Sequence, residues 1–569
     1  MVQPILAGLA LAATASAAFS GNLNYFSPSK HHASLGVSIN KVAKRTYANS
    51  HWDAAKLNFT HGVASGDPYE DSVILWTRAA PTADNDKSNV TVSGYVPLYD
   101  HSTEEYVQKS DSPVCVDWKI STSKTLEPAV DSGTVYTSSD VDYTVKVEAK
   151  KLAPYTVYYY QFSICNSNNT SPIGRTKTIP TKDGKVDTPV KLAVYSCSNY
   201  PFGFFNAYGN PVRKDSVDYV IHLGDYIYEY GNGEYGWGNS LGRIPLPDRQ
   251  IYTSVIFFFR IMSGIDQITG LPIRQVDMDD NLRIWREFSF GSLFDLVMLD
   301  TRQYDRAITD VYTNTDYVHA ISNDASRSLM GPRQEAWFYK TLKESSSRGA
   351  TWRVIGNQIV FSRMNESASL GDANPLNYDS WDGYQANRNR TFQVLYEQNV
   401  SNTIFLAGDS HASWVSDLVW LGEHEYDQNT GSGSVGVEFA GSAVSSPCPA
   451  GQNISLANAN AGSAWLTGAN RELQWQDLFY RGYYELSIDY DAVNASFFGI
   501  PTTRVKQGYE ISLANFTVLA GENKLHRWNN GSVVPGGVAE SGSLKNGKVV
   551  QTNLTLDTAT GEYLKYNSP

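Results

Sequence analysis

Between residues 58 and 180, short apolar segments are separated by stretches rich in Pro, Gly, Asp and Asn. The apolar segments include DSVILWTRAA, CVDWKISTS, YTVKVEAKKL and TVYYYQFSIC, which alternate with polar residues or contain short β-branched and aromatic runs. Residues of these types favour strands, and the residues between the segments favour turns. Strands of this length at this spacing predict a β-sandwich of the immunoglobulin type.

The pattern changes after residues 178–189, a Pro-, Gly- and Lys-containing stretch that we interpret as a linker between domains. The apolar runs VKLAVY, VDYVIHLG, LFDLVML, WRVIG and NTIFLAG follow it. Continuous apolar strands are buried on both faces, so these runs predict the interior of a layered α/β structure. Segments 330–349 and 384–399 have the apolar spacing of helices. We assign 189–500 to this second domain and 501–569 to a polar C-terminal extension.

Each of these runs ends in residues whose side chains bind metals or phosphate. Ligands of α/β sheets collect beyond the carboxyl ends of the strands, so we expect these residues to form one site. They are Ser196-Cys197-Ser198, Asp225 with Tyr228, Asp300 with Arg302 and Gln303, Asn357 with Gln358, and Asp409 with His411. A carboxylate, an imidazole, a thiolate and a phenolate together suit iron(III) or another transition metal.

The chain has four cysteines, which are too few for a fold held together by disulfides. Cys115 and Cys165 lie in the same strand-rich region and are candidates for a disulfide bond. Cys448 lies in a loop, SSPCPAG. The sequence leaves two interpretations of Cys197 open. Either it pairs with Cys448, or its thiolate binds a metal and is thereby shielded from oxidation.

The N-terminal sequence indicates export. An apolar stretch leads to Ala15-Ser16-Ala17, a pattern typical of a signal-peptidase site, so we interpret 1–18 as a signal peptide. An apolar N-terminal helix is the alternative. Asn-x-Ser/Thr occurs twelve times, which favours a secreted, N-glycosylated protein located outside the cell or in the cell wall.

Composition narrows the range of partners. The net charge of −12 argues against a nucleic-acid partner, because such partners are bound mainly through contacts to phosphates. No later segment reaches the roughly 18 continuous apolar residues of a membrane span. We therefore expect no nucleic-acid-binding module and no membrane span. We also expect a monomer, although the sequence does not determine the oligomeric state.

The motifs of the chain resemble those of a known family. FTHGVASGDPYEDSVILWTR, SCSNY, HLGDYIYEYG, MLDTRQYDR, IGNQ, WDGYQANR and LAGDSHASW follow one another over the length of the two expected domains. Together they resemble the PhoD-like alkaline phosphatases, a branch of the calcineurin-like metallophosphatases. The resemblance implies an immunoglobulin-like β-sandwich domain, followed by an α/β (α+β) metallophosphatase sandwich of two β-sheets flanked by helices.

The same resemblance implies a site with one iron(III) ion and calcium. Its iron ligands would be Cys197, Asp225, Tyr228 and His411, with Asp225 bridging the metals. Asp382 and Asp409 would lie on the calcium side, Arg243 would bind phosphate, and Asp300, Arg302 and Asn357 would support the ligands from behind. The implied reaction is hydrolysis of phosphate monoesters, diesters or both by a metal-activated hydroxide. Asp225, His411 and Arg243 would take part in catalysis.

One motif of the family is missing. A WDDHE segment followed by an asparagine for the second metal is expected after Arg243, where this chain has IPLPDRQIYTSVIFFFRIMSG. We interpret MDDN (278–281) as a surface or helix-start segment and not as its replacement. One hypothesis is that residues 245–275 come from a gene-model error, which sequencing of the transcript tests. The alternative function is therefore a catalytically impaired relative that acts as a secreted glycoprotein or surface-binding protein.

Overall fold

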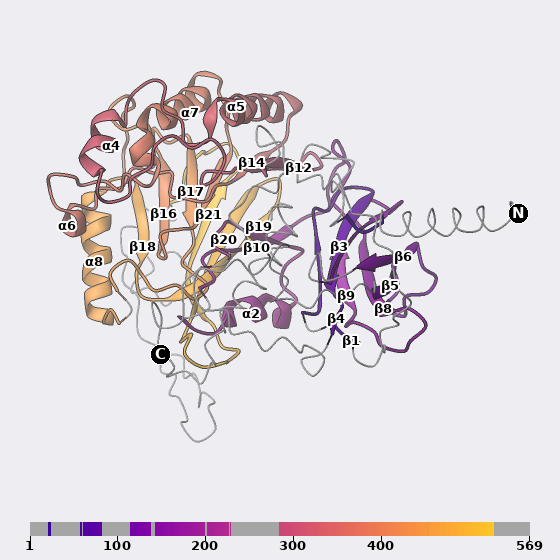
Figure 1. Ribbon diagram of the computed structural model, residues 1–569. Coiled ribbons are helices and arrows are strands. Elements are labelled where there is room, and N and C mark those ends of the chain that lie inside the picture. Colours follow the sequence, from indigo (N-terminus) through magenta and orange to yellow (C-terminus); the bar gives the residue numbers. More distant parts are fainter. Residues whose placement is uncertain are drawn as a thin grey trace, which may run out of the picture. The chain divides into compact units, whose positions relative to one another are not determined.

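The computed structural model (Figure 1) describes residues 21–23, 57–59, 61–81, 114–137, 143–199, 202–226, 228, 284–451 and 453–527. The expected signal peptide, Arg243, the MDDN segment and residues 245–275 lie outside the described residues. The chain divides into two compact units, and the boundary between them lies between Lys182 and Asp183. In the described part of the chain, no helix has both the length and the apolar character needed to cross a membrane.

The first unit consists of antiparallel strands. They are β1 (Leu57–Asn58), β2 (Val63–Gly66), β3 (Ser72–Arg78), β4 (Ala80–Pro81), β5 (Val114–Ser121), β6 (Asp131–Thr137), β7 (Thr144–Lys150), β8 (Val157–Ile164) and β9 (Gly174–Lys177). The larger sheets have the orders β2-β3-β7 and β6-β5-β8-β9, and β1 pairs with β4.

The alternation of apolar and polar residues explains how these sheets pack. Along β5, Val116, Trp118 and Ile120 are buried while the residues between them are partly exposed. These side chains join Leu75 of β3 and Phe162 of β8 in one hydrophobic core. Burial of one face of each sheet against the other makes a β-sandwich, so the structure expected for this region is confirmed.

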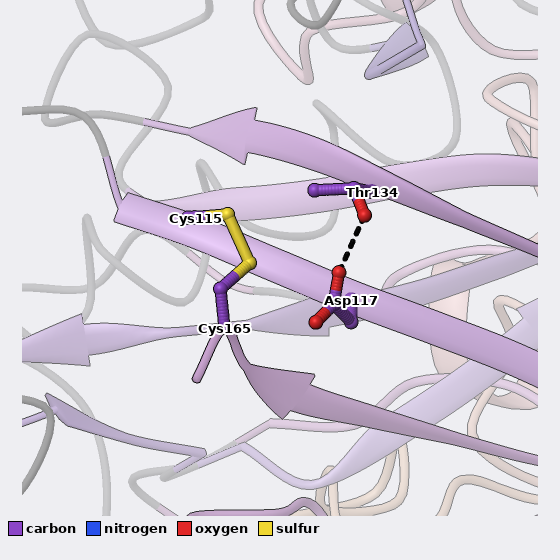
Figure 2. The surroundings of a disulfide bond; sticks show 4 residues. All are labelled: Cys115, Asp117, Thr134 and Cys165. Carbon is purple, nitrogen blue, oxygen red and sulfur yellow. Dashed lines mark hydrogen bonds between the residues drawn. A yellow bond between two sulfur atoms is a disulfide. The ribbon is translucent and has the colours of Figure 1, made fainter. Parts of the chain in front are cut away.

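Cys115 and Cys165 form a disulfide bond in this unit, with an S–S distance of 2.07 Å (Figure 2). Cys115 lies on β5, and Cys165 directly follows the neighbouring strand β8. The Cα atoms are 5.4 Å apart, and the two residues are separated by 50 positions in sequence. Closing a loop of that length restricts the unfolded chain and stabilises the fold by about 4 kcal/mol.

The second unit contains two larger sheets. A five-stranded sheet has the order β11-β10-β19-β20-β21, and a seven-stranded sheet has the order β12-β13-β14-β15-β17-β16-β18. Their strands are β10 (Val190–Tyr195), β11 (Tyr219–His222), β12 (Arg286–Phe290), β13 (Phe294–Met298), β14 (Trp352–Gly356), β15 (Thr403–Ala407), β16 (Ser413–Leu418), β17 (Gly436–Ala440), β18 (Leu473–Asp477), β19 (Arg481–Ile488), β20 (Ala492–Ile500) and β21 (Ile511–Leu519). Strands β13, β14, β15 and β17 run parallel, as do β10 and β11.

Aromatic side chains fill the space between the two sheets. The rings of Phe439 on β17 and Phe497 on β20 have centroids 6.2 Å apart, and those of Trp475 on β18 and Phe516 on β21 are 5.6 Å apart. In addition, the hydroxyl of Tyr484 donates to the backbone oxygen of Phe439 across the same interface, at 3.0 Å. The sheets therefore pack face to face as a sandwich.

Helices cover the outer faces of this sandwich (Figure 1). Helices α5 (Gly331–Arg348) and α7 (Gln385–Glu397) share a core with β13, β14 and β15, in which Phe338, Phe392 and Phe405 are buried. Helix α2 (Asn206–Lys214) packs on β10 and β19. The remaining helical segments are α4 (Thr315–Ile321), α6 (Ser367–Leu370), η8 (Trp381–Tyr384) and α8 (Leu456–Ala469). The expected two-sheet sandwich flanked by helices is confirmed.

The five-stranded sheet extends beyond residue 500, where we expected the domain to end. Strand β21 is its edge strand and pairs with β20 over almost its whole length. Its sequence is ISLANFTVL, and the side chains of Ile511, Leu513 and Val518 are buried. Further along, Arg527 forms an ion pair with the buried Asp417 of β16, at 2.5 Å. The described part of 501–527 therefore belongs to the core of the second unit.

Candidate metal centre

The ends of two neighbouring parallel strands bring Cys197 and Asp225 together. Strands β10 and β11 pair in register from Leu192 to Tyr195. The pairing continues beyond the strands, because the N–H of Cys197 donates to the backbone oxygen of Gly224 at 3.1 Å. The N–H of Ser198 donates in the same way to the backbone oxygen of Asp225, at 2.8 Å. The two turns that follow these strands are thus fixed to each other.

A loop that follows a strand of the seven-stranded sheet is bonded to the turn after β10. After β17, the N–H of Val444 donates to the backbone oxygen of Ser196 at 2.9 Å, and that of Ser445 donates to Cys197 at 3.3 Å. The turn after β15 carries Asp409 and His411. Since β15 and β17 are parallel neighbours in the seven-stranded sheet, both sheets of the sandwich contribute residues to one site.

Four of the expected residues form one group, which we call the ligand cluster: Cys197, Asp225, Tyr228 and His411. The ligand atoms of Cys197, Asp225 and His411 all lie within 4.8 Å of one another. The phenol oxygen of Tyr228 is 2.8 Å from Oδ2 of Asp225 and 2.9 Å from Nε2 of His411. Sγ of Cys197 is 3.7 Å from the same carboxylate oxygen. Side chains from three separate segments therefore converge on one point.

The backbone at this point adopts a conformation that residues other than glycine rarely occupy. The φ angles are 62° at Cys197, 49° at Asp225, 66° at Asp409 and 57° at His411. Each such residue costs about 1–3 kcal/mol and persists only where the surrounding structure enforces it. Strained positions of this kind concentrate at functional sites, and here they carry the side chains that converge.

The hydrogen bonds of His411 determine which of its nitrogens faces the cluster. Nδ1 is 2.8 Å from the backbone oxygen of Pro447, so it carries the proton and donates. Nε2 then presents a lone pair toward Tyr228. Burial, together with the positive charge of Arg481, lowers the pKa of His411 to about 4, so the ring is neutral near pH 7. A neutral imidazole oriented by a carbonyl is the form in which histidine binds metals.

Acidic groups crowd the cluster. Burial and the nearby carboxylate of Asp225 raise the pKa of the Cys197 thiol, and burial and the negative charges of Cys197 and Asp225 do the same for Tyr228. The thiols of Cys197 and Cys448 are both free, so the disulfide considered for Cys197 is not present. A cation at this point would compensate the negative charge and favour loss of the phenol and thiol protons.

The carboxylates expected on the calcium side are each paired with an arginine. Asp409 forms an ion pair with Arg302. Asp382 is 1% exposed, lies in η8, and accepts a hydrogen bond from Arg388 at 2.6 Å. Its second oxygen is 3.4 Å from the N–H of Met364. Among the described residues, neither Asp382 nor Asp409 belongs to the group of mutually close ligand atoms, so their place on the calcium side stays a prediction.

The residues expected to support the site shape its turns. Oδ1 of Asp300 accepts from the N–H groups of Arg302 and Gln303, at 3.2 and 2.9 Å, and burial raises the pKa of this carboxyl group. Oδ1 of Asn357 accepts from the indole of Trp381 at 3.3 Å. These contacts hold the turns after β13 and β14, and Asp300 contacts Arg302 through the backbone.

Sequence reasoning missed two residues of this region. Nη1 of Arg481 donates to the backbone oxygens of His411 and Ser446, and Nη2 donates to that of Leu478 at 2.9 Å. Asp379 accepts from Arg302 at 2.9 Å. The position of Asp379 next to the WDGY block was the available signal for it, whereas Arg481 follows no motif that we had connected with the site.

Comparison with known proteins places this fold in the phosphatase class of hydrolases. The family model described as PhoD-like phosphatase matches residues 192–258 and 269–497. A second model, described as the N-terminal domain of PhoD-like phosphatases, matches residues 44–180. The chain belongs to the PhoD-like phosphatase family, as its motifs had indicated.

Comparison with two individual relatives supports this family assignment. Alkaline phosphatase D of Bacillus subtilis (strain 168) is 28% identical over 576 residues, which cover 91% of this chain and 91% of that protein. A solved structure of PhoD is 26% identical and superimposes with a TM-score of 0.62, covering 87% of this chain and 96% of the other. The similarity therefore extends over both units of the chain.

Proposed function

We propose that this protein is a secreted phosphatase that hydrolyses phosphate monoesters, diesters or both with an iron(III) ion held by the ligand cluster. Family membership supports a hydrolase of the phosphatase type. The single observation that carries the metal part is the convergence of Cys197, Asp225 and His411 within 4.8 Å, with Tyr228 bonded to two of them.

The donor set of the cluster fits iron(III). It combines a thiol, a carboxylate, a phenol and a neutral imidazole, and the anionic forms of the first three are suited to a highly charged transition-metal ion. When bound, such an ion lowers the pKa of water from about 15.7 toward 7, and so supplies a nucleophile at neutral pH. No serine nucleophile is needed for this chemistry.

The residues of the chain prepare the cluster for a cation. With Nδ1 of His411 protonated, Nε2 and the Asp225 carboxylate are both acceptors for the single phenol proton of Tyr228. That proton and the thiol proton of Cys197 leave when a cation binds, because the anionic forms are the ligands. The backbone bonds between the two turns hold Cys197 and Asp225 in place throughout.

Export remains part of the proposal. The Cys115–Cys165 disulfide supports it, because such bonds persist in oxidising compartments. The sequence features that support it are the apolar N-terminus and the twelve Asn-x-Ser/Thr sites.

A second candidate function is a catalytically impaired glycoprotein. The observation in its favour is that Asp382 and Asp409, the carboxylates expected on the calcium side, are engaged by Arg388 and Arg302. Loss of one group that stabilises charge in a transition state costs about 10²–10³ in rate.

The decisive experiment measures iron by elemental analysis and hydrolysis of p-nitrophenyl phosphate and bis-p-nitrophenyl phosphate. We expect iron and hydrolysis in the purified protein, and the loss of both in Cys197→Ser. Cys448→Ser is the matched control, because it removes the other free thiol, which contacts the backbone oxygen of Gly451. A folded, iron-free and inactive wild-type protein would instead support the second candidate.

A further inference from the structure

Arg302 lies between two carboxylates beside the ligand cluster. Its Nη1 is 2.9 Å from Oδ2 of Asp379, and its Nη2 contacts Oδ1 of Asp409. Asp409 follows the same strand as His411 and precedes it by two residues. The side chain of Arg302 is 29% exposed, so its guanidinium is partly open to solvent at the edge of the site.

The position of this guanidinium is built into the fold. The backbone N–H of Arg302 donates to the buried Asp300 at 3.2 Å, which fixes the turn after β13. On the far side, Asp379 is held by Arg306 at 2.7 Å and by the hydroxyl of Thr309, also at 2.7 Å. Arg302 therefore points from a fixed turn toward a fixed carboxylate, unlike a flexible surface arginine.

Charge is distributed unequally over the two halves of the site. Asp379 and Asp409 are matched by Arg302 and Arg306, so these carboxylates are neutralised without a metal. Within the described residues, by contrast, no Lys or Arg forms an ion pair with Asp225, the carboxylate of the ligand cluster. In the ion pairs of the described residues, the half of the site around Asp225 has no positive charge, whereas the half around Asp379 and Asp409 has the guanidinium groups of Arg302 and Arg306.

We infer that the guanidinium of Arg302 takes the place of the second cation, so that this chain holds iron but no calcium at its site. This inference rests on the proposed function. Calcium takes about 6–8 oxygen ligands. Both carboxylate oxygens of Asp379 and one oxygen each of Asp382 and Asp409 are committed to arginine. The guanidinium has five N–H groups, and those not used by Asp379 and Asp409 are available to a phosphate oxygen of the substrate.

The test compares calcium binding by wild type and by variants of the purified full-length protein. Elemental analysis of wild type should give iron without stoichiometric calcium, and titration with CaCl₂ should give no heat from this site. Arg302→Ala exposes the facing carboxylates of Asp379 and Asp409. We expect this variant to bind calcium and to gain a few degrees in Tm when calcium is added. Arg302→Lys keeps a positive charge and should bind none.

Arg306→Ala is the matched control. It removes a guanidinium from the same Asp379 but leaves Asp409 paired with Arg302, so it should not create a calcium site. Without added calcium, Arg302→Ala should lose about 10²-fold in kcat/KM, since it lacks a group that stabilises charge on the phosphate. If Arg302→Ala does not fold, Arg302→Met, which preserves more of the side-chain volume, takes its place.

Two results would overturn the inference. One is stoichiometric calcium in the wild type that Asp409→Asn removes, and the other is a folded Arg302→Ala or Arg302→Met that gains no calcium binding. Both are independent of the proposed function, which fails if the wild type lacks iron and phosphatase activity whatever its calcium content.

Discussion

Nε2 of His411 lies 2.9 Å from the phenol oxygen of Tyr228, although the two residues are 183 positions apart in sequence. The other ring nitrogen of His411, Nδ1, donates a hydrogen bond to the backbone oxygen of Pro447. The lone pair of Nε2 is therefore directed at the phenol. The same phenol also contacts Asp225, at 2.8 Å. A cation bound here would therefore replace one shared proton with direct bonds to three side chains.

This geometry predicts a visible colour that depends on Tyr228. A deprotonated phenol bound to iron(III) absorbs visible light by charge transfer, so the wild-type protein should be coloured and Tyr228→Phe should be colourless. Absorption spectra, with thermal melts to show that both proteins are folded, provide the measurement. Tyr226→Phe is the control, since Tyr226 packs on His222 with ring centroids 4.8 Å apart and should leave the band in place. Persistence of the band in Tyr228→Phe would exclude Tyr228 as a ligand.

The disulfide of the first unit leads to a separate prediction about the stability of that unit. The double variant Cys115→Ser/Cys165→Ser should lose about 4 kcal/mol of the free energy of unfolding of that unit, because the open loop regains entropy when unfolded. Chemical denaturation followed by fluorescence measures the loss. Iron content should not change, since the ligand cluster belongs to the second unit. An unchanged unfolding transition would show that the bond contributes nothing.

The sequence predicted much of this site because its signals are local. Short apolar runs such as 190–195 and 403–407 favour buried strands. Polar residues that directly follow parallel neighbours are expected to lie close together. Cys197 and Asp225 meet for that reason. The same reasoning placed Tyr228 and His411 beyond strand ends, and the resemblance then assigned them as iron ligands.

What the sequence did not reveal depends on distant partners. The contact of Arg302 with Asp379 joins residues 77 positions apart, and no local pattern indicates it. Asp382 has the chemistry of a calcium ligand, but the fold buries it against Arg388, six residues further along the chain. Strand β21 was assigned to the C-terminal extension because the sequence beyond residue 500 is polar overall, whereas pairing with β20 determines its place.

A buried carboxyl group makes the stability of the second unit depend on pH. Burial raises the pKa of Asp477 to about 6, even though its oxygens accept from the N–H groups of Phe479 and Tyr480 at 2.8 and 3.2 Å. In the unfolded chain the pKa is about 3.9. The raised folded value means that this group contributes stability below about pH 4, which is lost as the pH rises through about 6.

Asp477→Asn should therefore gain stability relative to wild type as the pH rises. The amide cannot ionise, so the difference in unfolding free energy between variant and wild type should shift by up to about 3 kcal/mol between pH 4 and pH 7.5. Melting curves of both proteins across this range measure the shift, and the exposed Asp372→Asn serves as the control. A difference that does not vary with pH would show that Asp477 does not titrate in this range.

Arg481 connects the backbone segments that carry the site, although it contacts no ligand atom of the cluster. Its guanidinium donates to carbonyl groups of His411, Ser446 and Leu478. In Arg481→Met these carbonyls lose their partner, and we expect a loss of stability on the order of 3 kcal/mol. Because the backbone of His411 is no longer held, iron affinity should also fall, by about 10–100-fold.

Chelator competition measures this affinity, and Arg481→Lys tests whether one donor can rescue it. The exposed Arg471→Met is the matched control, because Arg471 also donates to a carbonyl, that of Tyr426 at 2.8 Å. If Arg481→Met were destabilised but kept the iron affinity of wild type, the residue would stabilise the fold without positioning His411. A coupled loss of stability and affinity, partly restored by lysine, would show that the arginine orients the imidazole through its backbone.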